Sequence, residues 1–149
     1  MTSDRSFIEK NRASTERMQA LAERLSDKQL QLPVGQHWNV ALVYAHLAFL
    51  DRRALYVLDE TEREGKVVNP DWDIFVNDLV LPLFAAIPPR EAVRIAIEEA
   101  ERIDRRLEGY PGRLLDLVLQ ERRRYVFRAD HRNEHLDEAE AALNEAARS

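Results

Sequence analysis

Apolar side chains recur along this chain at the three- and four-residue spacing of amphipathic helices, and no long stretch alternates as a strand does. The first predicted helix begins at Ser3 or Asp4 and ends at about Leu25. Its inward face is formed by Phe7, Asn11, Met18, Leu21 and Leu25. The Leu32-Pro33-Val34-Gly35 segment then breaks the chain.

The second predicted helix is the longest. Asn39 is a good N-cap, and Gly65 ends the helix after about Glu64. At 1.5 Å per residue this helix is about 37 Å long. A sustained apolar stripe follows it, formed by Val40, Val43, Leu47, Leu50, Ala54, Val57 and Leu58.

Prolines and glycines divide the second half of the chain. A third helical segment covers 72–81, and Pro82 ends or kinks it. Pro88-Pro89 opens a further helix, which the Gly109–Gly112 segment ends.

The last helical material covers 113–147, with a break near 127–130. We therefore predict an all-α protein, an antiparallel four-helix bundle in which facing helices build a site in the core. Residues 1–149 form a single domain of ordinary size.

Composition supports a soluble helical domain, because 45% of residues are hydrophobic and 33% are charged. There is no cysteine, which excludes disulfides, thiolate ligands and a thiol nucleophile of the chain itself. No apolar run reaches the roughly 20 residues of a membrane span, and residues 1–10 are too polar for a secretory signal. We expect a cytoplasmic protein that binds no membrane.

The formal net charge of −5 argues against nucleic acid as a partner. One local exception is the basic stretch 121–132. It contains five arginines, at positions 122, 123, 124, 128 and 132. They form either a solvated helix face or a positive wall beside a site for an anionic small molecule.

The four histidines carry the most chemical information. His131 and His135 lie about 40° apart on one helix face, one turn above the other, so both imidazoles can reach one ion. His46 lies in the most apolar part of the longest helix, either as a buried neutral histidine or as a third ligand from a facing helix. We interpret His37 as an exposed loop residue, with the rim of a pocket as the alternative.

The residues His131 to His135 also fit the H-x-x-E-H pattern of inverted zinc peptidases. In that class the glutamate is the general base, and a further carboxylate ligand lies well downstream. Here Glu134 points about 60° away from His131 and about 100° from His135, and the sequence after His135 is short. We therefore do not favour a peptidase.

Three stretches together resemble the DinB-like superfamily of four-helix bundles. They are Leu30–Pro33 followed by His37-Trp38-Asn39-Val40, the segment Val43–Phe49 around His46, and the His131–Glu138 segment with its H-x-x-x-H motif and acidic tail. This superfamily includes the metal-binding domains of mycothiol-dependent maleylpyruvate isomerases and the bacillithiol transferases.

The resemblance implies that His46, His131 and His135 are metal ligands at one end of a bundle that forms a homodimer. It also implies that water or substrate takes the open positions of the ion. One departure is His37 before the tryptophan, where a small or flexible residue is more usual, so the pocket rim is expected to differ.

A three-histidine ion with open positions acts as a Lewis acid and lowers the pKa of a bound water or thiol. Zinc is our first expectation and nickel the second. The favoured function is a thiol transferase or isomerase that uses a low-molecular-weight thiol of the mycothiol or bacillithiol type on a small electrophile. The alternatives are a metal-hydroxide hydrolase and a metal-stabilised binding or stress-response module without catalysis.

Side chains near the histidines are candidates for supporting roles. Arg53, Arg124 and Arg128 are expected to bind carboxylates of the thiol or substrate, or else to be surface charge. Glu134 and Glu138 are expected to contact the ligand histidines from behind, or to act as the base of the hydrolase alternative.

Overall fold

In the computed structural model, residues 4–72 and 75–149 are described, and 76% of them are helical. The four longest helices are α1 (Phe7–Arg24), α3 (Val40–Glu64), α5 (Pro89–Glu108) and α7 (Ala129–Ala147). The sheet found in the described residues is one antiparallel pair, β1 (Pro33–Val34) with β2 (Trp38–Asn39). The predicted all-α class is therefore confirmed.

The ends of α3 lie where its capping residues predict them. The Asn39 side-chain oxygen accepts a hydrogen bond from the backbone N–H of Leu42 at 2.8 Å. At the other end Gly65 has a φ of 72°, the left-handed conformation that glycine adopts without strain. His46 consequently lies in the second turn of a helix whose start is fixed.

Two predicted elements differ from the structure. Helix α4 (Val76–Ala85) contains Pro82 in its interior, so the proline does not end it. None of the α4 residues is buried, so water can pair with the carbonyl that the proline leaves free. The predicted start of this segment partly falls outside the described residues.

The last helical stretch is also divided differently. Its break covers 122–128, after α6 (Gly112–Glu121), and includes the short helix η1 (Arg123–Tyr125). This break is wider than the predicted one, and it places His131 in the first turn of α7.

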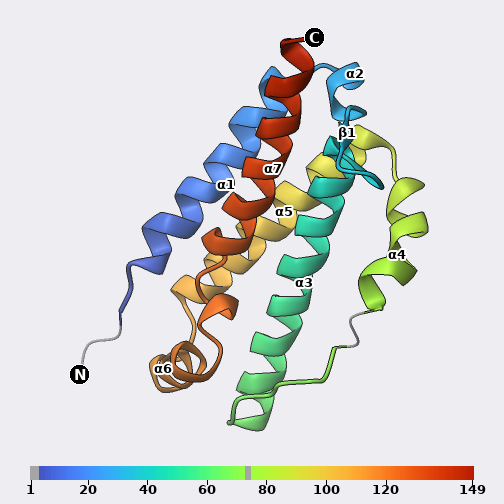
Figure 1. Cartoon of the computed structure of the whole chain (residues 1–149). Coiled ribbons are helices and arrows are strands. Elements are labelled where there is room, and N and C mark those ends of the chain that lie inside the picture. The colour runs from blue at the N-terminus through green and yellow to red at the C-terminus, as the bar shows by residue number, and fades with distance from the viewer. Residues whose placement is uncertain (1–3, 73–74) are drawn as a thin grey trace.

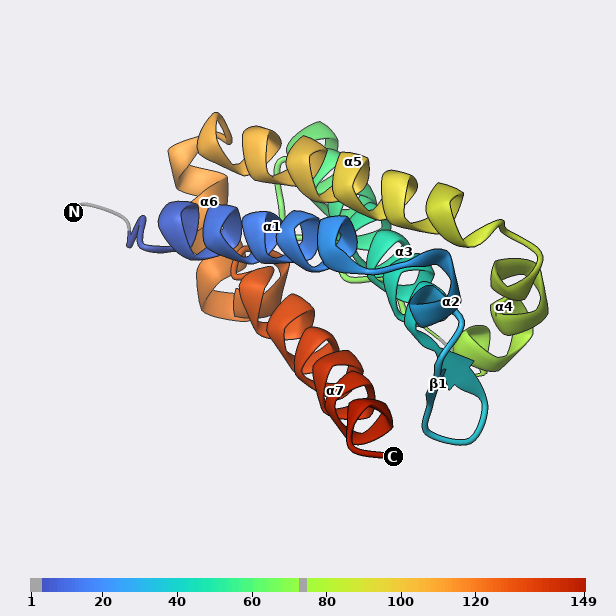
Figure 2. The same ribbon diagram turned by 90° about the horizontal axis from the view of Figure 1, so that it is seen from above.

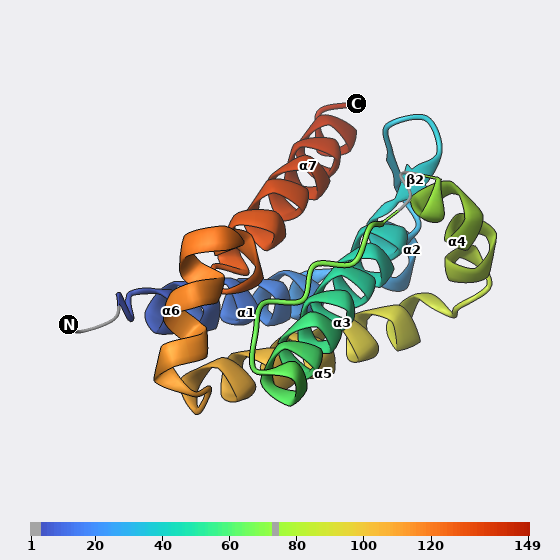
Figure 3. The same cartoon turned by 90° about the horizontal axis from the view of Figure 1, so that it is seen from below.

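The four long helices pack side by side, with α1 against both α5 and α7, and α3 against the same two helices (Figure 1). Seen from above, α7 diverges from α1, and the two helices are farthest apart at the C-terminal end of α7 (Figure 2). The short helix α2 (Asp27–Leu30) and the β1–β2 pair precede α3. Helix α4 lies outside α3, and residues 66–72 run back along α3 before it (Figure 3).

A buried polar layer divides the core into two apolar clusters. One cluster surrounds Met18, Tyr44 and Leu136, and the other surrounds Phe7 and Leu107. The layer between them is formed by Asn11, Ser14, Thr15, Asp51, Asp104, Arg128 and Arg132. None of the helices in the described part of the chain is long and apolar enough to cross a membrane.

Candidate metal centre

Helices α3 and α7 bring the three predicted ligands into one region. The rings of His46 and His135 lie 4.7 Å apart between centroids, at an interplanar angle of 81°. His131 lies one turn before His135 on α7. When protonated, its imidazole contributes to the lowering of the pKa of His46, after burial and the nearer His135.

The separation of these rings fits a shared ion. With zinc–nitrogen distances of 2.0–2.1 Å, two imidazoles on one tetrahedral ion have ring centres roughly 5 Å apart. Within residues 4–72 and 75–149, no three His, Asp or Glu side chains lie close enough together to hold a metal ion as they stand. The spacing of His46 and His135 alone suits a shared divalent ion, and the three-histidine ligand set remains a prediction.

Trp38 forms an aromatic wall beside the histidines. Its ring lies 4.8 Å from that of His46 in an edge-to-face arrangement, and 6.4 Å from that of His135 with the planes parallel. Because Trp38 belongs to β2 and is followed directly by the cap residue Asn39, its place is set by the start of α3. The wall restricts both rings to few orientations.

The protein environment keeps two of the imidazoles neutral. Burial lowers the pKa of His46 to about 4, and the neighbouring His135, His131 and Arg53 strengthen the effect. Burial, followed by the charges of Arg128 and Arg124, lowers the pKa of His131 to about 4. Neutral imidazole is the form that binds a metal, so these two side chains need not lose a proton first at pH 7.

The two predicted supporting glutamates each follow a histidine by three residues. Glu134 Oε2 lies 3.8 Å from His131 Nδ1, and Glu138 Oε2 lies 3.6 Å from His135 Nδ1. Both carboxylates are mostly exposed, and both distances exceed a hydrogen bond. The carboxylates therefore face the Nδ1 atoms of the two rings but form no hydrogen bond that would fix the ring orientations.

Separate cavities open at the two ends of the histidine pair on α7. A cavity of about 320 Å³ is lined by His131, Arg53 and the 121–125 turn. A larger one of about 560 Å³ is lined by His135, Trp38, Glu138 and the exposed His37. The two share no lining residue. His37 is therefore both the exposed loop residue that the sequence indicated and part of a pocket rim, the alternative interpretation.

The three arginines expected to bind substrate occupy different environments. Arg53 lines the smaller cavity, as does Arg124, whose Nη2 lies 3.0 Å from Glu134 Oε2. The Arg128 side chain is 3% exposed, and its Nε donates to Asp51 Oδ1 at 2.9 Å. Its guanidinium is engaged inside the protein, so the structure gives it an internal role in place of the predicted contact with a ligand.

The sequence profile of the DinB superfamily matches residues 11–145, which include all three histidines and most of the chain. The chain belongs to the DinB superfamily. Searches of curated proteins and of solved structures gave no significant match. For this DinB-superfamily chain, the family therefore identifies the fold and leaves the reaction to be argued from the site.

One group of important residues in this DinB chain was not predicted as such. Arg132 was expected to lie on a solvated helix face or in a positive wall beside a site, but it is 1% exposed. Its Nε donates to Asp51 Oδ2 at 3.1 Å and its Nη2 to Asp104 Oδ1 at 3.0 Å. Three oxygens of α1 accept from its Nη1, those of Asn11, Ser14 and Thr15. The available sequence signal was the presence of Asp51 and Asp104 on otherwise apolar helix faces.

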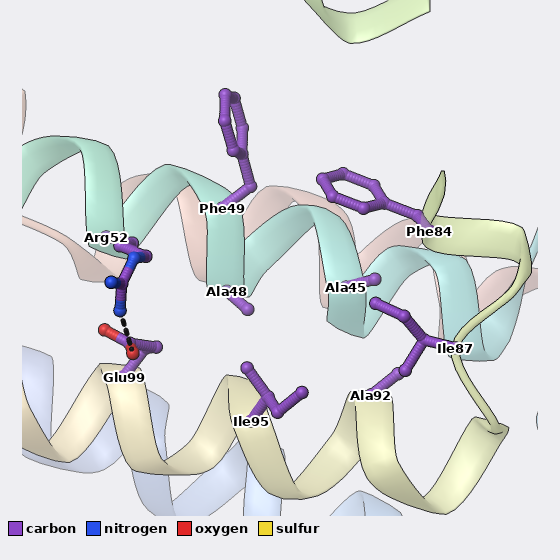
Figure 4. Close-up of a pocket in the computed structure, with 9 residues that line it drawn as sticks. All are labelled: Ala45, Ala48, Phe49, Arg52, Phe84, Ile87, Ala92, Ile95 and Glu99. Carbon is purple, nitrogen blue, oxygen red and sulfur yellow. Dashed lines mark hydrogen bonds and ion pairs between the residues drawn. The ribbon is translucent and has the colours of Figure 1, made fainter. Parts of the chain in front are cut away.

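A further cavity, of about 270 Å³, lies between α3 and α5 beneath Phe84 and Ile87 (Figure 4). Its lining is mostly apolar. At one end Arg52 Nη1 donates to Glu99 Oε1 at 3.0 Å. None of the predicted site residues lines it, so we do not place the chemistry of this DinB chain there.

Proposed function

We propose that this chain is a metal-dependent thiol transferase or isomerase, with His46, His131 and His135 holding one divalent ion, zinc first and nickel second. The single observation that carries the proposal is the close approach of His46 and His135 from different helices, with a separate cavity at each end of the α7 histidine pair. Two cavities suit a reaction between two small molecules.

The bound ion would supply Lewis acidity that lowers the pKa of a thiol and keeps its sulfur anionic at neutral pH. The chain has no cysteine, so the thiol comes from outside, as a low-molecular-weight thiol. In a transfer, the sulfur forms a bond to carbon while the leaving group departs with its electron pair. The thiol proton is released to solvent.

The protein's own residues position the reactants. Glu134 and Glu138 would accept hydrogen bonds from the Nδ1 atoms of His131 and His135, which turns each Nε2 towards the shared space. Trp38 limits how far the rings of His46 and His135 can rotate. The fold that holds them is, in this proposal, an antiparallel four-helix bundle.

Cobalt-substituted protein provides the test of this function. Mycothiol, bacillithiol, glutathione and coenzyme A are added in turn, with the S-methylated form of each as the matched control. We expect at least one free thiol to change the cobalt d–d spectrum, because sulfur replaces water as a ligand, and the same thiol to support turnover of a small electrophile. If no thiol changes the spectrum, the metal-stabilised binding module becomes the better-supported function.

We also propose a homodimer, on the basis of the family resemblance. In α4 the side chains of Leu79 and Leu83 are 72% and 68% exposed and lie one turn apart, which makes them the candidate contact. Light scattering coupled to size-exclusion chromatography tests the dimer. Leu79→Glu should shift the mass to that of a monomer, and a monomeric wild type would contradict this part of the proposal.

A further inference from the structure

The cavity beside His131 is lined almost entirely by basic and aromatic side chains. It lies between α3 and the turn that joins α6 to α7, with a volume of about 320 Å³. Its lining includes Arg53, Arg122, Arg123, Arg124, Tyr125 and His131. A space of this size accommodates a small organic molecule and not merely a single ion.

Two of the four guanidinium groups that line the cavity, those of Arg53 and Arg122, have no carboxylate partner among the described residues. Arg53 Nε is buried without a hydrogen-bond partner, and its guanidinium lies 5.3 Å from the Trp72 ring. Within the described residues, the Arg122 side chain forms no hydrogen bond or ion pair. Arg123 Nη1 forms a long ion pair with Asp4 Oδ2, at 3.9 Å.

Two carboxylates lie close to the cavity, and they offset only part of the charge of its four arginines. Glu121 belongs to the lining, and Glu134 pairs with Arg124. Asp51, the buried carboxylate of α3 on this side, is shared between Arg128 and Arg132. The cavity is consequently a concentrated positive region in a chain whose net charge is −5.

We infer that this cavity is a carboxylate-binding subsite, in which Arg53 and Arg122 bind the carboxylate of a small organic acid whose body lies against Tyr125. Guanidinium groups bind carboxylates through paired charge-assisted hydrogen bonds, and an unpaired buried N–H favours such a ligand strongly. The identification of the acid as a reactant rests on the proposed function, because the subsite adjoins His131. The carboxylate belongs either to the electrophile or to the thiol.

Isothermal titration calorimetry on the protein as purified, without thiol or turnover, tests this inference. The probes are succinate, its uncharged analogue succinamide, and inorganic phosphate. Succinate should bind, and succinamide should not. Arg53→Gln and Arg122→Gln should each weaken succinate binding at least about tenfold. Arg105→Gln, a change at an exposed side chain of α5, is the matched control and should leave it unchanged.

Several results would overturn the inference. They are absence of succinate binding, equal binding by the double variant of Arg53 and Arg122, or tighter binding of phosphate than of succinate. Arg122 is exposed, so its variant is expected to fold even if Arg53→Gln does not. Metal content is measured on each variant, so loss of the ion is not mistaken for loss of the subsite.

A competition experiment identifies the source of the carboxylate. If glutathione displaces succinate and cysteamine, a thiol without a carboxylate, does not, the subsite holds the thiol's carboxylate. If both thiols bind and succinate stays bound, the subsite holds the electrophile's carboxylate. Failure of every thiol to bind would contradict the proposed transferase while leaving the succinate result intact, so the two claims fail separately.

Discussion

Asp51 of α3 and Arg132 of α7 form a buried ion pair, with 3.1 Å between Arg132 Nε and Asp51 Oδ2 and each side chain 1% exposed. Arg132 adjoins His131 in the sequence, and the same carboxylate also accepts from Arg128. The pair therefore ties the first turn of α7, which carries a predicted ligand, to the helix that carries His46.

Removal of this carboxylate's charge should disturb both stability and the metal site. In Asp51→Asn, two buried guanidinium groups lose their shared anion, and breaking a buried pair costs about 3–5 kcal/mol. We expect urea unfolding to show a loss of that order, together with reduced metal content although all three histidines remain.

Glu91→Gln is the matched control for this experiment. It removes an exposed partner of Arg94 on α5, and such surface pairs contribute about 0–1 kcal/mol. If Asp51→Asn were as stable as Glu91→Gln and kept its metal, the polar layer would have no role in positioning α7.

Trp38 offers an optical test of its position beside the histidines. In the Trp72→Phe variant, Trp38 is the one tryptophan left in the chain, so the fluorescence reports on Trp38 alone. Because its ring lies 4.8 Å from His46 and 6.4 Å from His135, binding of nickel there should quench its fluorescence in a saturable way. The same titration of Trp72→Phe combined with His46→Ala should show little quenching. Equal quenching in both proteins would place the nickel elsewhere.

Much of the fold was readable from local sequence signals. Asn39 and Gly65 defined α3 correctly, and the apolar stripe assigned to it is buried as predicted. Helix periodicity placed His131 and His135 on one face, and the family resemblance implied that His46 converges with them. These features depend on residues close in sequence or on a known arrangement of helices.

The roles of the arginines were not readable in the same way. Arg122 and Arg132 belong to one basic stretch, yet Arg132 is buried in ion pairs and Arg122 lines a cavity. The difference arises from the break before α7, which turns the start of that helix inwards. A partner such as Asp104 lies on another helix, so sequence spacing does not reveal the pairing.

Acid should destabilise the protein through His46 before carboxylates protonate widely. The folded state holds the pKa of His46 at about 4, against an ordinary value of 6.5. Between these values the unfolded chain binds the extra proton, so stability is present above about pH 6.5 and falls as the pH drops towards 4. The loss from this group is at most about 3 kcal/mol.

Urea unfolding of chelator-treated protein at pH 7, 6 and 5 measures this effect. The groups that face His46 and lower its pKa are His135, His131 and Arg53. His46→Ala should have a flatter dependence on pH than the wild type over this range, whereas His37→Ala should keep the wild-type slope. An unchanged slope in His46→Ala would show that this imidazole does not titrate as described.

Metal content is the most direct test of the central claim, that His46, His131 and His135 hold one divalent ion. It is measured by inductively coupled plasma mass spectrometry on the purified wild type, on each histidine-to-alanine variant of these three, and on His37→Ala as the matched control. We predict a single ion per chain in the wild type and in His37→Ala, and a sharp loss in the other three. Full retention of the metal in His46→Ala, His131→Ala and His135→Ala would contradict the account.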